Sequence, residues 1–145
     1  MIESLYRGTP YKGKERVSPR SFLVISPTYP YEQEGGSFTT FLGDILAGFG
    51  DVKRVLPQEA IDTITSSAPP NVIVLEGWNE GSAELVQQLR QVAPEATLVL
   101  DELLTDTGKS VQILRNAFKA GCDNVITRHY YNANVVKTYQ EAGII

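Results

Sequence analysis

Short apolar runs alternate with amphipathic segments along most of this chain. Residues 22–25 are apolar throughout and are followed by Ser26 and Pro27, which is typical of a strand buried on both faces of a parallel sheet. The next apolar residues recur at helical spacing and predict an amphipathic helix with Phe38, Phe41, Leu42, Ile45, Leu46 and Phe49 on its buried face. Gly50 offers a stop for this helix before a second strand at residues 52–56.

The alternation continues to the end of the sequence. A second helix is predicted from Pro57 to about residue 67, a central strand at 71–75, and a third helix that Ser82 caps. A fourth strand is predicted at 97–100 and a fifth at 124–127, with a helix between them that presents Val111, Leu114 and Phe118. A last helix is expected at 133–141. Strands separated by helices predict right-handed crossovers and a parallel sheet with helices on both faces.

The predicted fold class is therefore α/β, a flavodoxin-like three-layer sandwich whose five parallel strands have the order 2-1-3-4-5. Residues 1–20 carry several charges, glycines and prolines without periodicity, so we expect a polar N-terminal appendage. The domain itself is expected to comprise residues 21–145.

Composition narrows the class of protein. The 145 residues are 42% hydrophobic and 21% charged, as in an ordinary globular domain, and the net charge of −4 argues against nucleic-acid binding. A single cysteine, Cys122, suits a reducing compartment, and the absence of an apolar stretch of about 20 residues argues against a membrane span. We expect a cytoplasmic protein. The one histidine, His129, has no neighbouring ligand residue, so neither a metal nor another cofactor is expected.

Polar side chains gather where the predicted strands end, and in a sheet of this order functional loops meet at the carboxyl edge. Carboxylate oxygens are preferred ligands of hard metal ions and the guanidinium of Arg128 can bind a phosphate, so this edge could be a cation or phosphate site. Alternatively, Arg128 only neutralises Glu76 or Asp101 and has a structural role. Both interpretations stay open. The candidate residues of this edge are Ser26, Thr28, Glu76, Trp78, Asp101, Glu102, Thr127 and Arg128.

Aromatic residues flank the same edge. Trp78 follows Glu76-Gly77, and Tyr130 and Tyr131 follow the fifth strand. Aromatic side chains are frequent anchors of protein interfaces, so these residues are candidates for a contact surface with a protein partner. The sequence identifies neither that partner nor an oligomeric state.

Two segments of the chain resemble response-regulator receiver domains. Pro57-Gln-Glu-Ala-Ile61 followed by Pro69-Pro-Asn-Val-Ile-Val-Leu-Glu76 is similar to the receiver's second helix and phospho-acceptor strand. Phe118-Lys-Ala-Gly-Cys-Asp-Asn-Val-Ile-Thr-Arg128 resembles the segment that carries the receiver's lysine. The resemblance covers about residues 22–140 and implies a signalling module.

The residues that run receiver chemistry are replaced. The resemblance implies an acidic, magnesium-binding pair after strand one, an acceptor aspartate after strand three, and Ser or Thr after strand four. Here Ser26, Pro27 and Thr28 follow strand one, Glu76 holds the acceptor position and Asp101 the strand-four position. We therefore expect a non-catalytic pseudo-receiver that cannot be phosphorylated, with a Glu76–Arg128 pair as a hypothesis and residues 109–139 as the contact face.

Two alternatives remain. The loop Ser26-Pro-Thr-Tyr-Pro-Tyr-Glu-Gln-Glu-Gly-Gly36 resembles the opening of the N-terminal domain of two-domain glycosyltransferases, which implies that Tyr29 to Gly36 binds a glycan or a sugar nucleotide. Alternatively, the protein is a small-molecule sensor that binds its ligand at the acidic edge.

Overall fold

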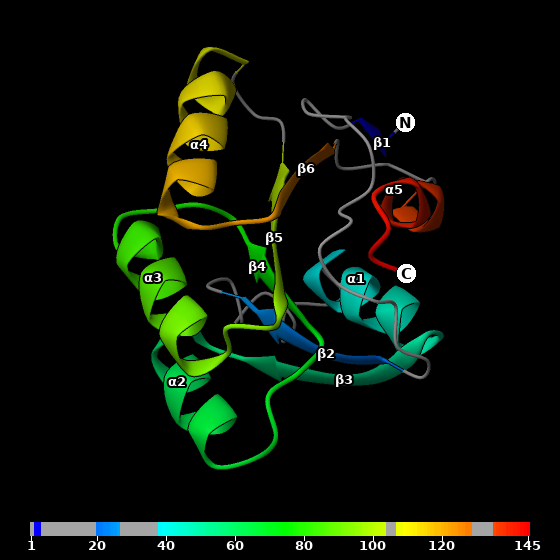
Figure 1. The fold of residues 1–145 in the computed structure, drawn as a ribbon. Helices are drawn as coiled ribbons and strands as arrows, with labels where there is room; N and C mark the ends of the chain where they lie inside the picture. Colours follow the sequence, from blue (N-terminus) through cyan, green and yellow to red (C-terminus); the bar gives the residue numbers. More distant parts are fainter. Residues whose placement is uncertain (1, 4–19, 27–37, 104–106, 129–134) are drawn as a thin grey trace.

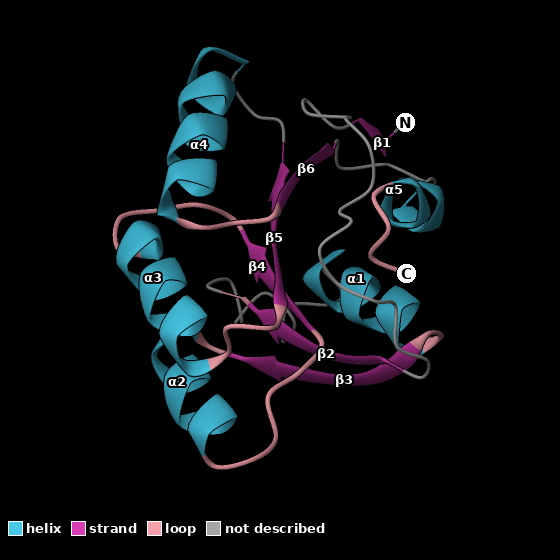
Figure 2. Cartoon of the chain, in the orientation of Figure 1, coloured by secondary structure: helices cyan, strands magenta, loops and turns pink. Residues whose placement is uncertain are grey.

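The computed structural model describes residues 2–3, 20–26, 38–103, 107–128 and 135–145, which form a sheet between two layers of helices (Figures 1 and 2). The strands are β1 (Ile2–Glu3), β2 (Arg20–Ile25), β3 (Gly50–Val55), β4 (Val72–Glu76), β5 (Thr97–Leu103) and β6 (Asn124–Arg128). The helices are α1 (Phe38–Ala47), α2 (Pro57–Thr65), α3 (Ser82–Val92), α4 (Thr107–Ala120) and α5 (Val135–Glu141).

The five strands from β2 onward are parallel and lie in the spatial order β3-β2-β4-β5-β6. Numbered by their appearance in the predicted domain, this is the order 2-1-3-4-5, so the predicted flavodoxin-like architecture is confirmed. The sequence did not predict the short sixth strand, β1, which pairs antiparallel with β6 through Ile2 with Arg128 and Glu3 with Thr127. The division into an appendage and a domain stays a prediction, because residues 4–19 lie outside the described part.

Each face of the sheet buries its own apolar cluster, because successive side chains of a strand point to opposite faces. On one face, Leu23 and Ile25 pack with residues of α2, α3 and α4, among them Ile64 and Leu89. On the other face, helices α1 and α5 cover the cluster of Phe22, Val24, Leu42, Leu46, Val72, Val74, Val99, Ile126, Val135 and Tyr139. Figure 1 shows these two helical layers on either side of the sheet.

The structure differs from the sequence-based prediction at three residues of the helices and strands. Helix α1 ends at Ala47, so Phe49 lies beyond it and is 38% exposed instead of continuing the buried face. Gly50 starts β3 and does not cap the helix. Among the described side chains of α4, Ala117 is buried and the predicted Leu114 and Phe118 pack partly buried against the core, whereas Val111 is 49% exposed because it points away from that face.

Gly50 is required by the close approach of two strands. A Cβ atom at this position would lie 1.8 Å from the carbonyl oxygen of Arg20, the residue that it pairs with in β2. Glycine is therefore the one residue that lets β3 start beside β2 without displacing backbone. Among the described residues, no helix is long and apolar enough to cross a membrane.

Candidate functional site

Two carboxylates lie next to one another at the carboxyl edge of the sheet. Glu76 ends β4 and is paired in register with Asp101 of β5. Because alternate residues share a face, Glu76 continues the buried column of Val72 and Val74, on the side that α1 and α5 cover. Glu76 and Asp101 are both buried. Burying a carboxylate is costly unless a cation or hydrogen-bond donor accompanies it, so the partners of these groups define the site.

Glu76 forms an ion pair with Arg54 of β3. The Arg54 Nη2 atom lies 3.8 Å from the Glu76 Oε1 atom, and the two side chains are 17% and 6% exposed. Arg54 belongs to the edge strand of the parallel set, and β2 lies between it and β4, so its long side chain reaches across a strand to the carboxylate. The glycine at position 43 of α1 makes room, since a Cβ there would come within 3.2 Å of the Arg54 Cδ atom.

Asp101 accepts a hydrogen bond from α5. The Tyr139 hydroxyl donates to the Asp101 Oδ2 atom at 2.5 Å, and the two residues are 0% and 3% exposed. A short O–H···O bond of this length is typical of a hydroxyl that donates to a charged acceptor. The bond joins residues 38 positions apart and fixes the last helix to the end of β5.

Glu102 and Thr127 face the other side of the sheet. They are paired in register on β5 and β6, and they alternate with Asp101 and Ile126. The structure therefore separates Glu102 from the two buried carboxylates, whereas the sequence had grouped all three. The Glu102 Oε2 atom accepts a hydrogen bond from the backbone N–H of Trp78 at 2.8 Å.

The pKa of Glu102 is raised above its ordinary value. Burial is the largest cause, and the negative charge of Asp101 adds to it, while the hydrogen bond from the Trp78 N–H acts in the opposite direction. The neighbouring Gly77 N–H donates to the Asp101 carbonyl oxygen at 2.9 Å. Two successive N–H groups thus tie the loop after β4 to the end of β5, and the Trp78 side chain packs partly buried against the core.

The donor set at this edge does not fit a divalent cation. Such ions prefer several carboxylate or carbonyl oxygens, yet Glu76 already faces a guanidinium and Asp101 a phenol hydroxyl. Ser26 follows β2 as a buried hydroxyl residue, and its N–H donates to the Val55 carbonyl oxygen at 3.0 Å. Within the described ranges, no three His, Cys, Asp or Glu side chains are grouped so that they could hold a metal ion.

Several residues that the sequence predicted for a site lie outside the described part of the structure. These are Thr28, Tyr130, Tyr131, His129 and the loop from Tyr29 to Gly36, while Arg128 is described only as a backbone partner in β6. The predicted Glu76–Arg128 pair therefore stays a hypothesis, and the described partner of Glu76 is Arg54.

Sequence reasoning overlooked Arg54 and Tyr139, the two residues that engage the carboxylates. A signal for Arg54 was present, since it shares a strand face with the apolar Val52 and lies near the carboxyl end of β3, a strand that the sequence predicted at 52–56. Tyr139 sits one helical turn after Val135 and Val136, which places it on the apolar face of α5.

Comparison with known proteins identifies the fold. No family model and no curated protein sequence matches the chain. An adenylate cyclase structure from Rhodopirellula baltica superposes with a TM-score of 0.62 at 19% identity, over 86% of this chain and 87% of that chain. A response regulator from Thermotoga maritima gives a TM-score of 0.61 at 17% identity, over 89% and 98% of the two chains.

A third similar structure is a complex. It is the P1 domain of CheA3 with CheY6 from R. sphaeroides, and it matches with a TM-score of 0.58 at 17% identity, over 88% of this chain and 93% of that chain. Together these likenesses establish that the chain has the receiver-like fold, as its two quoted segments suggested.

Proposed function

We propose that this chain is a receiver-like signalling module that is not phosphorylated and that works by contact with a protein partner. The observation that carries the proposal is the engagement of both edge carboxylates by side chains of the same chain. Glu76 faces Arg54 at 3.8 Å and Asp101 binds Tyr139 at 2.5 Å, both in buried surroundings.

This arrangement opposes phosphoryl transfer in two ways. A phosphoryl group brings charge that needs a metal ion or free cations for compensation, and the described residues of the edge include no group of three acidic, His or Cys side chains that would hold magnesium. An approaching phosphoryl group would also meet the negative charge of Asp101 beside the acceptor position. The Arg54 guanidinium instead provides a permanent positive charge next to Glu76.

The contact surface proposed for the partner comprises the exposed sides of α4 and α5 next to β6, whose own side chains from Asn124 to Thr127 are buried. Helix α4 presents Val111 to solvent, and Lys119 and Lys137 are exposed on α4 and α5. One similar structure contains a receiver bound to a partner domain, which supports a protein-binding role for this fold. The glycosyltransferase alternative is less favoured, as the similar structures are mainly receivers. The acidic-edge sensor is also less favoured, because its two buried carboxylates are already engaged.

The test for phosphorylation uses a small phosphodonor with magnesium, followed by intact-mass measurement. We expect no added phosphoryl group on the chain under conditions that modify a conventional receiver domain in a parallel sample. A stable adduct on Glu76 or Asp101 would disprove the first part of the proposal.

The test for partner binding compares two substitutions that place a carboxylate on an exposed helix surface. Val111→Glu alters α4, and Ala83→Glu alters α3 in the same helical layer but away from the proposed face. In affinity purification from the native source, we expect Val111→Glu to reduce recovery of the partner, while Ala83→Glu leaves it unchanged. Equal recovery with both variants would exclude this face.

A further inference from the structure

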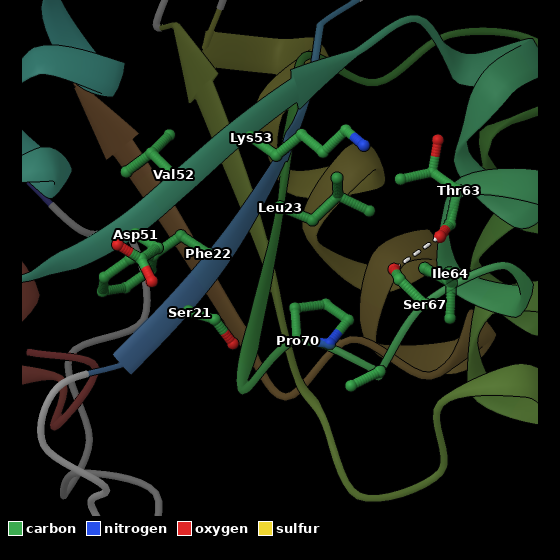
Figure 3. A pocket seen from close by; sticks show the side chains of 11 residues that line it. Ser21, Phe22, Leu23, Asp51, Val52, Lys53, Thr63, Ile64, Ser67 and Pro70 are labelled. Carbon is green, nitrogen blue, oxygen red and sulfur yellow. Dashed lines mark hydrogen bonds between the residues drawn. The ribbon is translucent and has the colours of Figure 1, made fainter.

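A second candidate site lies at the opposite edge of the sheet from Glu76 and Asp101. A pocket of about 160 Å³ opens between strands β2 and β3 and the C-terminal end of α2 (Figure 3). Its floor is formed around Leu23, and Ile64, Ala68 and Pro70 form its helical and loop wall. It exists because α2 ends at Thr65, before the helix can cover the amino-terminal half of β3.

The interior of this pocket is apolar and its size is that of one small ring. Leu23 and Ile64 are buried core residues, so a ligand here would lie against the edge of the hydrophobic core. A cavity of about 150 Å³ with aliphatic walls accommodates benzene in another protein. A compact apolar group therefore fits the volume of this pocket.

Two serine hydroxyl groups near the pocket already donate within the protein. The Ser67 Oγ donates to the Thr63 carbonyl oxygen at 2.9 Å, which Figure 3 draws as a dashed line. The Ser21 Oγ donates to the Asn71 Oδ1 atom at 3.2 Å. The protons of these two serine hydroxyls are thus not available for a ligand without breaking these bonds, whereas the Thr63 hydroxyl in the pocket lining is not held by them.

Two charged side chains remain at the rim. Among the described residues, neither Lys53 nor Asp51 takes part in an ion pair. Both belong to β3 on the α2 side of the sheet, but in Figure 3 the Lys53 ammonium extends toward Thr63 on α2, whereas the Asp51 carboxylate points the other way. Lys53 is therefore the charge that a ligand in the pocket would meet.

We propose that this pocket binds a small monocarboxylate whose body is a single ring or a branched alkyl group. The apolar body lies on Leu23, Ile64 and Pro70, and the carboxylate pairs with the Lys53 ammonium. The site is independent of the proposed signalling function, since none of its residues belongs to the carboxyl edge.

Sodium benzoate is the probe, and the full chain labelled with ¹⁵N is titrated at constant ionic strength. We expect amide shifts at Leu23, Lys53 and Ile64 with a dissociation constant on the order of 1 mM, as suits a ligand of about nine non-hydrogen atoms. The amide of Asp101 should not move. Benzylamine has the same ring and the opposite charge, and it should bind at least severalfold more weakly. Equal or tighter binding of benzylamine, or no saturable shifts with benzoate, would overturn the proposal.

Two variants locate the binding. Ala68 is exposed at the pocket wall, so Ala68→Phe should fill the pocket and abolish the benzoate shifts while circular dichroism stays unchanged. Lys53→Gln should weaken binding about twofold to fivefold, which is the range of one exposed ion pair. Lys119→Gln removes an exposed lysine on α4 and is the matched control, with unchanged affinity expected. If Ala68→Phe is unfolded, Lys53→Gln against Lys119→Gln decides, and equal affinities of these two variants refute the assignment.

Discussion

Replacing Tyr139 by phenylalanine removes a single oxygen atom from the buried link between α5 and β5. The aromatic ring stays and continues to pack in the core, so the change isolates the 2.5 Å hydrogen bond to Asp101. The variant loses a bond to a charged acceptor and leaves the buried carboxylate with one donor fewer. Hydrogen bonds to charged groups contribute about 1.5–3 kcal/mol, and we expect the free energy of unfolding to fall by this amount.

Urea denaturation followed by circular dichroism measures the effect. For a domain of this size, each kcal/mol lowers the melting temperature by about 2–4 °C, so the Tyr139→Phe variant should melt roughly 3–12 °C below the wild type. A double-mutant cycle with Asp101→Asn should give a coupling energy of about 1 kcal/mol or more, because the two side chains touch. Lys137→Gln, on the same helix but exposed, is the control and should leave stability unchanged.

The reasoning fails on a clear outcome. If Tyr139→Phe lies within about 0.5 kcal/mol of the wild type, as substitutions away from buried features usually do, the hydroxyl does not hold α5 to the sheet. A coupling energy near zero between the two positions would lead to the same conclusion.

Three further predictions concern other parts of the fold. Gly50→Ala should lower the midpoint of urea unfolding strongly, because its Cβ would lie 1.8 Å from the Arg20 carbonyl oxygen, whereas Gly48→Ala makes ordinary contact and should be tolerated. Glu102→Gln should raise the free energy of unfolding at pH 7. The folded-state pKa of Glu102 is raised above its unfolded-state pKa, so the wild type loses stability as the pH rises and the folded carboxyl ionises, whereas glutamine stays neutral. Near pH 3, where the Glu102 carboxyl is protonated, the difference in stability between the variant and the wild type should vanish. Burial raises the pKa of the Cys122 thiol to about 12, so a disulfide reagent at pH 8 should label it in urea but not in the native protein.

The strands and their order could be predicted because each parallel strand is a short apolar run with a helix on either side. Val72 to Leu75 shows this well, since four consecutive apolar residues satisfy both faces of the sheet at once. The two-residue strand β1 could not be predicted, because Ile2 and Glu3 carry no periodicity and form a strand only through β6. The buried faces of the helices were predicted less accurately than the strands, and Val111 in α4 shows that an apolar residue at helical spacing can remain exposed.

The candidate site was predicted as a position but not as a set of contacts. The sequence placed Glu76 and Asp101 at one edge, and the register of β4 with β5 places them side by side. Their partners come from elements far away in the chain, Arg54 from β3 and Tyr139 from α5. Such pairings depend on which helix covers which face and on the space left by Gly43, and neither follows from local spacing.

Burial bears on the two meanings that the sequence left open for this edge. An exposed pair of carboxylates is available to a cation, whereas a buried pair needs cations or hydrogen-bond donors of the protein itself. Glu76 and Asp101 are buried, the first 3.8 Å from the Arg54 guanidinium and the second hydrogen-bonded to Tyr139, and Glu102 faces the opposite side of the sheet. We infer that the contacts at the carboxyl edge hold β3, β4, β5 and α5 in one arrangement, and that the surface this arrangement supports is what a partner recognises.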